Sequence, residues 1–129
     1  MTEQEKQLLL KDLCARLPYR VMVSIDGYRD GVLKGIEEDR FVVSTEHRIN
    51  YPIRLCKPYL RSVSDLTFEE FKKIHLDGDI LYNADDKIVI YESWETVDYM
   101  NEIMIDYRNL IGKGLALKAP EGMYKTKTE

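Results

Sequence analysis

The chain has 129 residues, of which 44% are hydrophobic and 33% charged, and its formal net charge is −4. This length suits one hydrophobic core and is short for two ordinary domains, so we expect a single domain over residues 1–124 and a disordered tail over 125–129. No apolar run approaches the roughly 20 residues that a membrane-spanning helix needs, which argues against a membrane protein.

Residues 1–5 are polar and acidic, whereas a secretory signal begins basic and then turns apolar, so we expect a cytoplasmic protein. Cys14 and Cys56 both have apolar neighbours, and in a reducing compartment we expect two buried thiols and no disulfide. Charge is distributed unevenly: residues 11–61 hold ten Lys/Arg and seven Asp/Glu, whereas residues 62–129 hold eight and fourteen. This asymmetry either lets the two halves attract each other or creates a local field for a partner.

The first predicted element is an N-terminal helix. Thr2 and Glu5 have the spacing of a capping box, and Pro18 ends the helix because it disfavours helical geometry at the residue before it. Apolar residues recur between these limits at helical spacing, as in a helix that packs on a sheet: Leu9, Leu10, Leu13, Cys14 and Leu17.

Four short strands are predicted next, over residues 19–25, 30–37, 40–44 and 49–53. They are rich in β-branched and aromatic residues and are separated by turn residues, of which Asp26-Gly27 is a hairpin signal. We expect an antiparallel meander, with a small SH3-like barrel as its curled alternative.

The second half is predicted to alternate helix and hairpin. Residues 55–64 form a connector, Thr67 and Glu70 form a second capping box, and a short helix with an apolar face follows (Phe68, Phe71, Ile74). Residues 80–82 and 88–91 are predicted to form a hairpin, and residues 94–108 a third helix with a core stripe (Val97, Met100, Met104, Ile105). Residues 110–123 should lie over the body as an extended apolar tail. The predicted fold class is therefore α+β.

No constellation of residues in the sequence indicates catalysis or a cofactor. His47, His75 and the two cysteines are too far apart in sequence for a local zinc pair, and the acidic residues around Gly78 lack the pattern of a calcium loop. Gly112-Lys113-Gly114 fails the spacing of a phosphate-binding loop. The carboxylates of the third helix are expected on its solvated face (Glu95, Asp98, Glu102, Asp106). We therefore predict that the protein is not an enzyme and binds no metal or cofactor. A small hydrolase ranks third, after the two binding functions described below.

Two kinds of binding surface remain. Arg40, Arg48 and Arg54 lie in the strand region with interleaved tyrosines, a pattern used by proteins that bind single-stranded nucleic acids. Tyr99 and Tyr107 lie off the core stripe of the third helix and could contact a protein partner, since tyrosine is enriched at interfaces.

Three stretches also resemble a known family. They are residues 11–19, with Leu17-Pro18-Tyr19; residues 56–61, with Lys57-Pro58-Tyr59; and residues 106–108 leading through 114–116 to 119–124. Together they resemble a family of small proteins with no assigned activity from anaerobic gut bacteria and their prophages. The family pattern has glycine after Leu-Pro-Tyr, where this chain has Arg20. The resemblance implies an accessory, phage-related context and no functional residue.

From these observations we predict a non-enzymatic protein-interaction module with an unknown protein partner. The alternative is an accessory protein that binds nucleic acid through a basic face of the N-terminal sheet.

Overall fold

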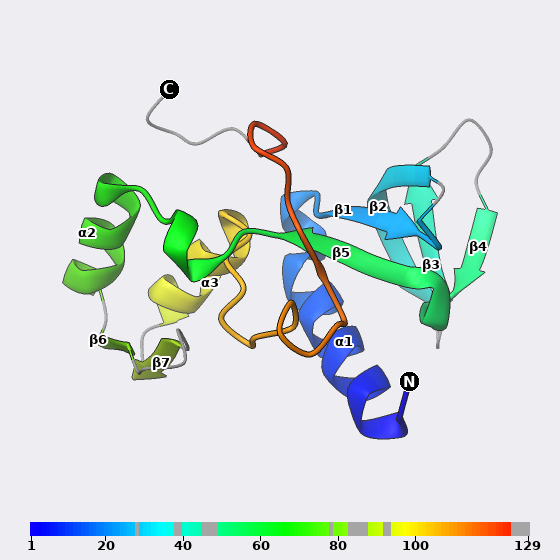
Figure 1. Cartoon of the computed structure of the whole chain (residues 1–129), viewed down its shortest axis with the longest axis horizontal. Helices are drawn as coiled ribbons and strands as arrows, with labels where there is room; N and C mark the ends of the chain where they lie inside the picture. The colour runs from blue at the N-terminus through cyan, green and yellow to red at the C-terminus, as the bar shows by residue number, and fades with distance from the viewer. Residues whose placement is uncertain are drawn as a thin grey trace.

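The computed structural model describes residues 1–27, 29–37, 40–44, 49–77, 79–82, 88–91 and 94–124. The described chain is α+β: the first helix packs on a six-stranded mixed sheet, and a separate two-stranded hairpin lies beside the second and third helices at the other end of the molecule (Figure 1). The predicted tail over 125–129 lies outside the described residues.

Helix α1 (Glu3–Arg16) begins at the predicted capping box. The Glu5 backbone N–H donates to Thr2 Oγ1 at 3.0 Å, and the Thr2 N–H donates to Glu5 Oε1 at 2.9 Å. A 3-10 helix, η1 (Leu17–Tyr19), follows, and Arg20 then takes the left-handed conformation with φ 62°. The turn therefore forms without the glycine that most readily adopts this conformation.

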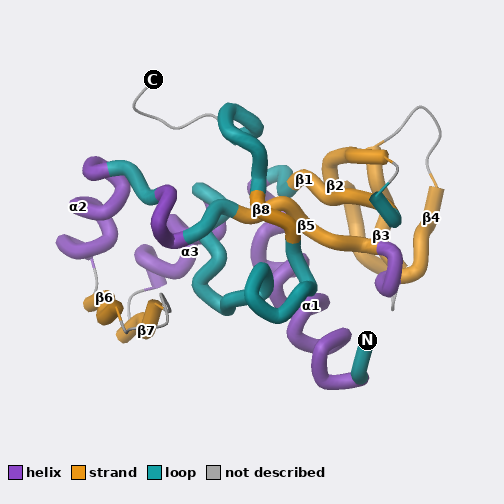
Figure 2. The backbone as a smooth tube through the Cα atoms, in the orientation of Figure 1, coloured by secondary structure: helices purple, strands orange, loops and turns teal. Residues whose placement is uncertain are grey.

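The large sheet has the strand order β4-β3-β2-β1-β5-β8 (Figure 2). Its strands are β1 (Met22–Ile25), β2 (Arg29–Glu37), β3 (Arg40–Ser44), β4 (Ile49–Pro52), β5 (Cys56–Leu60) and β8 (Leu117–Lys118). Strands β1 to β4 form the predicted antiparallel meander, while β8 runs parallel to β5. The described strands leave β4 and β8 at opposite edges, so the sheet is open and closure into an SH3-like barrel is not confirmed.

Strand β5 lies where the sequence predicted a connector, and that prediction was wrong. A connector was predicted because this stretch contains Pro58, and proline cannot donate a hydrogen bond to a strand ladder. The Asp26 N–H donates to Leu55 O, so Asp26 and Leu55 form a hydrogen-bonded pair. Hydrogen-bonded and non-hydrogen-bonded pairs alternate along antiparallel strands, which makes Val23–Pro58 a pair without mutual hydrogen bonds. The Pro58 nitrogen therefore points away from β1, and β8 begins to pair only at the next residue, Tyr59.

The main core lies between α1 and one face of the large sheet. Its fully buried members include Leu9 and Leu13 of α1, Val23 of β1, and Phe41 of β3. The Phe41 ring also packs on Tyr51 of β4, with 5.6 Å between ring centroids. Cys56 belongs to this core as predicted, whereas Cys14 is exposed, so the prediction of two buried thiols was wrong for Cys14.

A second, smaller cluster joins α2 (Phe68–Asp77) to α3 (Trp94–Glu102). Its buried apolar residues are Ile74, Met100, Ile103 and Ile105. The predicted hairpin is confirmed as β6 (Asp79–Tyr82) paired with β7 (Ile88–Tyr91). Figure 1 shows this α2–α3 region at one end of the molecule and the large sheet at the other, with β5 running between them.

Helix α3 ends at Glu102, six residues earlier than predicted. Met104 has a positive φ of 63°, and Ile105 forms a parallel bridge with Arg61 at the end of β5. Tertiary pairing thus overrides helical periodicity at this point. Asp106, predicted on a solvated helix face, is instead buried and accepts hydrogen bonds from the N–H groups of Leu110 and Ile111.

The C-terminal segment was predicted to be extended, but it is built mostly from turns. Turns occupy the chain up to residue 114, β8 adds a short strand, and a further turn leads to Tyr124. The Met22 N–H donates to the Tyr124 hydroxyl at 2.9 Å, and this hydroxyl donates to Tyr59 O at 2.8 Å. The hydroxyl thus bridges the end of the β1–β5 pair, at the position where a direct backbone hydrogen bond would continue the ladder.

Candidate interaction surface

The start of α2 is fixed by a second capping box that has an additional partner. The Thr67 N–H donates to Glu70 Oε1 at 2.9 Å, and the Glu70 N–H donates to Thr67 Oγ1 at 3.1 Å. Arg61 at the end of β5 donates to both carboxylate oxygens of Glu70, at 2.7 and 2.8 Å. Sequence reasoning identified the cap but missed the arginine, which is close to Glu70 only in the folded chain.

The Arg61 guanidinium is saturated at both of its terminal nitrogens. Besides the two Glu70 bonds, Nη1 donates to Ile103 O at 3.1 Å and Nη2 to Asp65 O at 2.9 Å. Burial raises the pKa of Glu70, but the hydrogen bonds from Arg61 and Thr67 outweigh burial and leave this pKa below its usual value. The Arg61–Glu70 pair therefore joins the end of the sheet to α2 as an ion pair.

With Glu70 and Ile74 facing inward, the opposite side of α2 faces outward. Phe68 is 75% exposed and Phe71 40% exposed, so of the three residues predicted to form the apolar face only Ile74 is buried. We call Phe68 and Phe71 the aromatic face. The other aromatic rings whose burial the structure describes are at least partly covered, which makes these two exposed rings unusual.

A second polar network lies at the centre of the molecule. Asp12 on α1 accepts from Arg16 Nε at 2.9 Å and from Arg108 Nη1 at 2.7 Å, and Arg16 Nη2 donates to Ile105 O at 2.8 Å. Arg16 and Asp12 are fully buried, and Arg16 Nη1 has no hydrogen-bond partner within the described structure. We assign this network a structural role, because its charges are enclosed and paired. The stretches 11–19 and 106–108, quoted above for the family resemblance, meet in it.

The two tyrosines predicted for a partner surface make contacts inside the molecule. Tyr99 is half-buried, and Lys73 Nζ lies 4.4 Å from its ring centroid. The Tyr107 hydroxyl donates to Asn101 Oδ1 at 2.7 Å, and Arg108 lies over the Tyr107 ring at 4.6 Å. These contacts cover part of both rings.

The arginines predicted for nucleic acid are only partly described. Arg40 begins β3 opposite Pro52, and Arg54 lies two residues beyond Pro52, so both occupy one end of the sheet and both are exposed. Arg48 lies outside the described residues. Both side chains are exposed, and no other described residue pairs with either guanidinium group.

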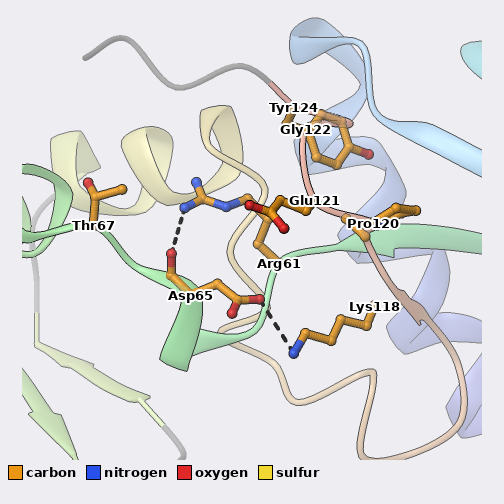
Figure 3. Close-up of a pocket in the computed structure, with 9 residues that line it drawn as sticks. Arg61, Asp65, Thr67, Lys118, Pro120, Glu121, Gly122 and Tyr124 are labelled. Atoms are coloured by element: carbon orange, nitrogen blue, oxygen red, sulfur yellow. Dashed lines mark hydrogen bonds and ion pairs between the residues drawn. The ribbon is translucent and has the colours of Figure 1, made fainter. Parts of the chain in front are cut away.

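A pocket of about 470 Å³ opens next to α2, between Arg61, Asp65 and Thr67 on one side and the C-terminal segment on the other (Figure 3). The segment contributes residues 118–122 and Tyr124 to its lining. A smaller pocket of about 300 Å³ lies at the sheet and includes Arg54 and Lys57. Within the described ranges, no group of His, Cys, Asp and Glu side chains could hold a metal ion.

No protein-family model, no curated protein and no solved structure matches this chain. No helix in the part of the chain that the structure describes is long and apolar enough to cross a membrane.

Proposed function

We propose that this chain is a non-enzymatic protein-interaction module of the cytoplasm that binds a partner through the aromatic face of α2. The exposure of Phe68 and Phe71 carries the proposal. Its accessory, phage-related context is proposed from the family resemblance alone. Cys14 and Cys56 are free thiols, which is compatible with a reducing compartment.

The aromatic face has the chemistry of a binding hot spot. Burial of a phenylalanine side chain contributes about 1.5–3 kcal/mol, so covering two partly exposed rings would give a partner several kcal/mol. Interfaces concentrate binding energy in a few aromatic anchors of this kind. The rigid support is present as well, because the capping box and the Arg61–Glu70 pair fix the helix that carries both rings.

The test uses a displayed library of random peptides selected on the immobilised full chain. Selected peptides are then titrated by fluorescence anisotropy against the wild type, the double variant Phe68→Ser/Phe71→Ser, and the control Lys11→Ser on the exposed side of α1. We expect enrichment of peptides whose affinity falls at least tenfold in the double variant and is unchanged in the control. Absence of enrichment, or equal affinity for all three proteins, would overturn the proposal.

The second candidate function is nucleic-acid binding by the sheet. It is supported by exposed cations that no described residue pairs: Arg20, Arg29, Lys34, Arg40, Arg54 and Lys57. Anisotropy with labelled single-stranded DNA, duplex DNA and RNA at about 50 and about 200 mM salt tests it, because phosphate-driven binding weakens steeply with salt. Saturable binding lost in Arg40→Ser/Arg54→Ser would support this candidate, and no binding at the lower salt would remove it.

A further inference from the structure

The lining of the pocket beside α2 includes the residue that precedes the aromatic face in the sequence. Thr67 lines the pocket, and the next residue is Phe68, the most exposed large hydrophobic side chain among the described residues. Its volume of about 470 Å³ lies within the range of sites for small molecules or single side chains. A partner that covers Phe68 therefore has this pocket within reach.

The charges in the pocket differ in how far they are already paired. Arg61 lines it, but all four N–H groups of its terminal nitrogens bind Glu70, Ile103 O and Asp65 O. Since these four donors are used, Arg61 has only its Nε–H left to offer, and we do not assign it the recognition of an anionic ligand. Its charge is also balanced by Glu70.

The remaining charged groups are Asp65, Glu121 and Lys118. Lys118 Nζ lies 3.8 Å from Asp65 Oδ2, and the two side chains are 61% and 39% exposed. An exposed pair at this distance contributes little, so a ligand can displace it at small cost. Glu121 is exposed and makes no hydrogen bond or ion pair with any described residue.

Figure 3 shows how these groups lie around the space. The carboxylates of Asp65 and Glu121 come from opposite walls, the first from η3 (Val63–Asp65) and the second from the C-terminal segment. Tyr124 lines the same pocket. Its hydroxyl is already hydrogen-bonded to Met22 N–H and Tyr59 O, so only its ring remains for contact with a ligand. Two carboxylates and an aromatic ring are the groups that bind a cationic side chain.

We propose that this pocket receives an arginine or lysine side chain of the protein partner whose apolar residues cover the aromatic face. This inference rests on the proposed function and names the partner chemistry: a segment with a basic residue next to apolar ones. The carboxylates of Asp65 and Glu121 bind the cation, and Lys118 is displaced from Asp65 when it enters. Guanidinium is the favoured cation, because its planar donors match the geometry of a carboxylate.

The test is a titration of the ¹⁵N-labelled full chain, followed by amide chemical shifts. The probes are N-acetyl-arginine methylamide, its neutral isostere N-acetyl-citrulline methylamide, and N-acetyl-glutamate methylamide. We expect saturable shifts at Asp65, Thr67 and residues 118–122 with the arginine probe, and affinity at least tenfold weaker for the other two probes. The variants Asp65→Asn and Glu121→Gln should each weaken arginine binding about three- to tenfold, which corresponds to the loss of one charged partner.

Glu69→Gln is the matched control, because Glu69 is an exposed acid of α2 outside the pocket lining. Equal binding of arginine and citrulline, stronger binding of the glutamate probe, no saturable shift, or the same weakening in Glu69→Gln would each overturn the proposal. The proposed function has its own readout. Peptides that require Phe68 but carry no enriched basic residue would remove the pocket assignment and leave the interaction module standing.

Discussion

The two ends of the molecule are built differently. At one end, α1 buries a continuous apolar stripe against the large sheet, and residues such as Leu9 and Phe41 are fully enclosed. At the other end, the described residues of the α2–α3 cluster hold a small apolar core and depend on one bidentate ion pair between Arg61 and Glu70. Both ends combine burial with specific polar bonds, but the apolar core is larger at the first end, so the Arg61–Glu70 pair has a larger share in holding the second.

This difference suggests that the two ends have different roles, one in stability and one in recognition. A closely packed core resists change and leaves few apolar groups for a partner. The buried residues of the small helical cluster do not include Phe68, which is left largely exposed for a partner. We therefore locate stability mainly at the sheet and recognition mainly at α2.

The largest predicted effect is at the sheet. Phe41→Ala should lower the free energy of unfolding by about 3–5 kcal/mol, because it removes a fully buried ring and leaves a cavity beside Tyr51. Denaturant unfolding followed by circular dichroism measures this loss. A loss below about 1 kcal/mol would show that the sheet core is not the main source of stability.

At the helical end, Glu70→Gln should destabilise the protein by about 2–3 kcal/mol, because the bidentate charge pair with Arg61 is lost. Hydrogen exchange should rise most in α2 and less in β1 and β2. Asp65→Asn, which alters only an exposed pair, is the control and should change stability by less than about 0.5 kcal/mol.

The same variant has a pH signature. The pKa of Glu70 is below its usual value in the folded protein, so its ion pair stabilises the fold above the unfolded-state pKa. This stability is lost as pH falls from about 4.3, the usual value of a glutamate, through the lower folded-state pKa. Unfolding free energies between about pH 6 and pH 3 should therefore fall less steeply in Glu70→Gln than in the wild type, and identical slopes would contradict the assignment.

A smaller loss of unfolding free energy is expected from a change at the contact between the C-terminal segment and the sheet. Tyr124→Phe removes the hydroxyl that bridges Met22 N–H and Tyr59 O, and should cost about 1–2 kcal/mol. Tyr19→Phe, at a half-buried tyrosine for which no hydroxyl bond is described, serves as the comparison. Equal stability of the two variants would mean that the bridge contributes nothing.

Replacement of Arg20 should act in the opposite direction. Arg20 is exposed and has a φ of 62°, a backbone conformation that glycine adopts with less strain. Arg20→Gly should therefore stabilise the fold by about 0.5–1 kcal/mol, which is the strain energy removed minus the entropy that glycine adds to the unfolded chain. Thermal unfolding should show a rise of a few degrees. A fall in the midpoint would indicate that the arginine side chain makes a stabilising contact.

The smallest effect on stability is predicted at the aromatic face. Phe68→Ser should change the unfolding free energy by no more than about 0.5 kcal/mol, because the ring is 75% exposed. A loss above about 2 kcal/mol would show that the ring supports the fold, which would remove it as a candidate anchor.

Local signals predicted much of this fold. The two capping boxes, the β-branched runs and the Asp26-Gly27 turn lie where the structure has α1, α2 and the β1–β2 connection. These features depend on neighbouring residues, so a single sequence contains them. The strand β5 and the early end of α3 depend on pairing between distant segments, and no local pattern reports such pairing.

The candidate surface was harder to predict for the same reason. The spacing of Phe68, Phe71 and Ile74 is that of an apolar stripe, but the structure turns Ile74 and Glu70 to the core, where Glu70 pairs with Arg61. The cap identified Glu70, but its buried partner is nine residues earlier on another element. The tyrosines chosen from sequence, Tyr99 and Tyr107, are partly covered by cations that the fold brings to them.

The most direct test of the account is the affinity of a library-selected peptide for the wild type and for Phe68→Ser/Phe71→Ser, measured by isothermal titration calorimetry with unfolding curves for both proteins. We predict that both proteins are folded at the temperature of the titration and that the affinity is at least tenfold lower in the variant, because exposed parts of both rings are available to a partner. Equal affinity for the two proteins would contradict the assignment of α2 as the recognition element.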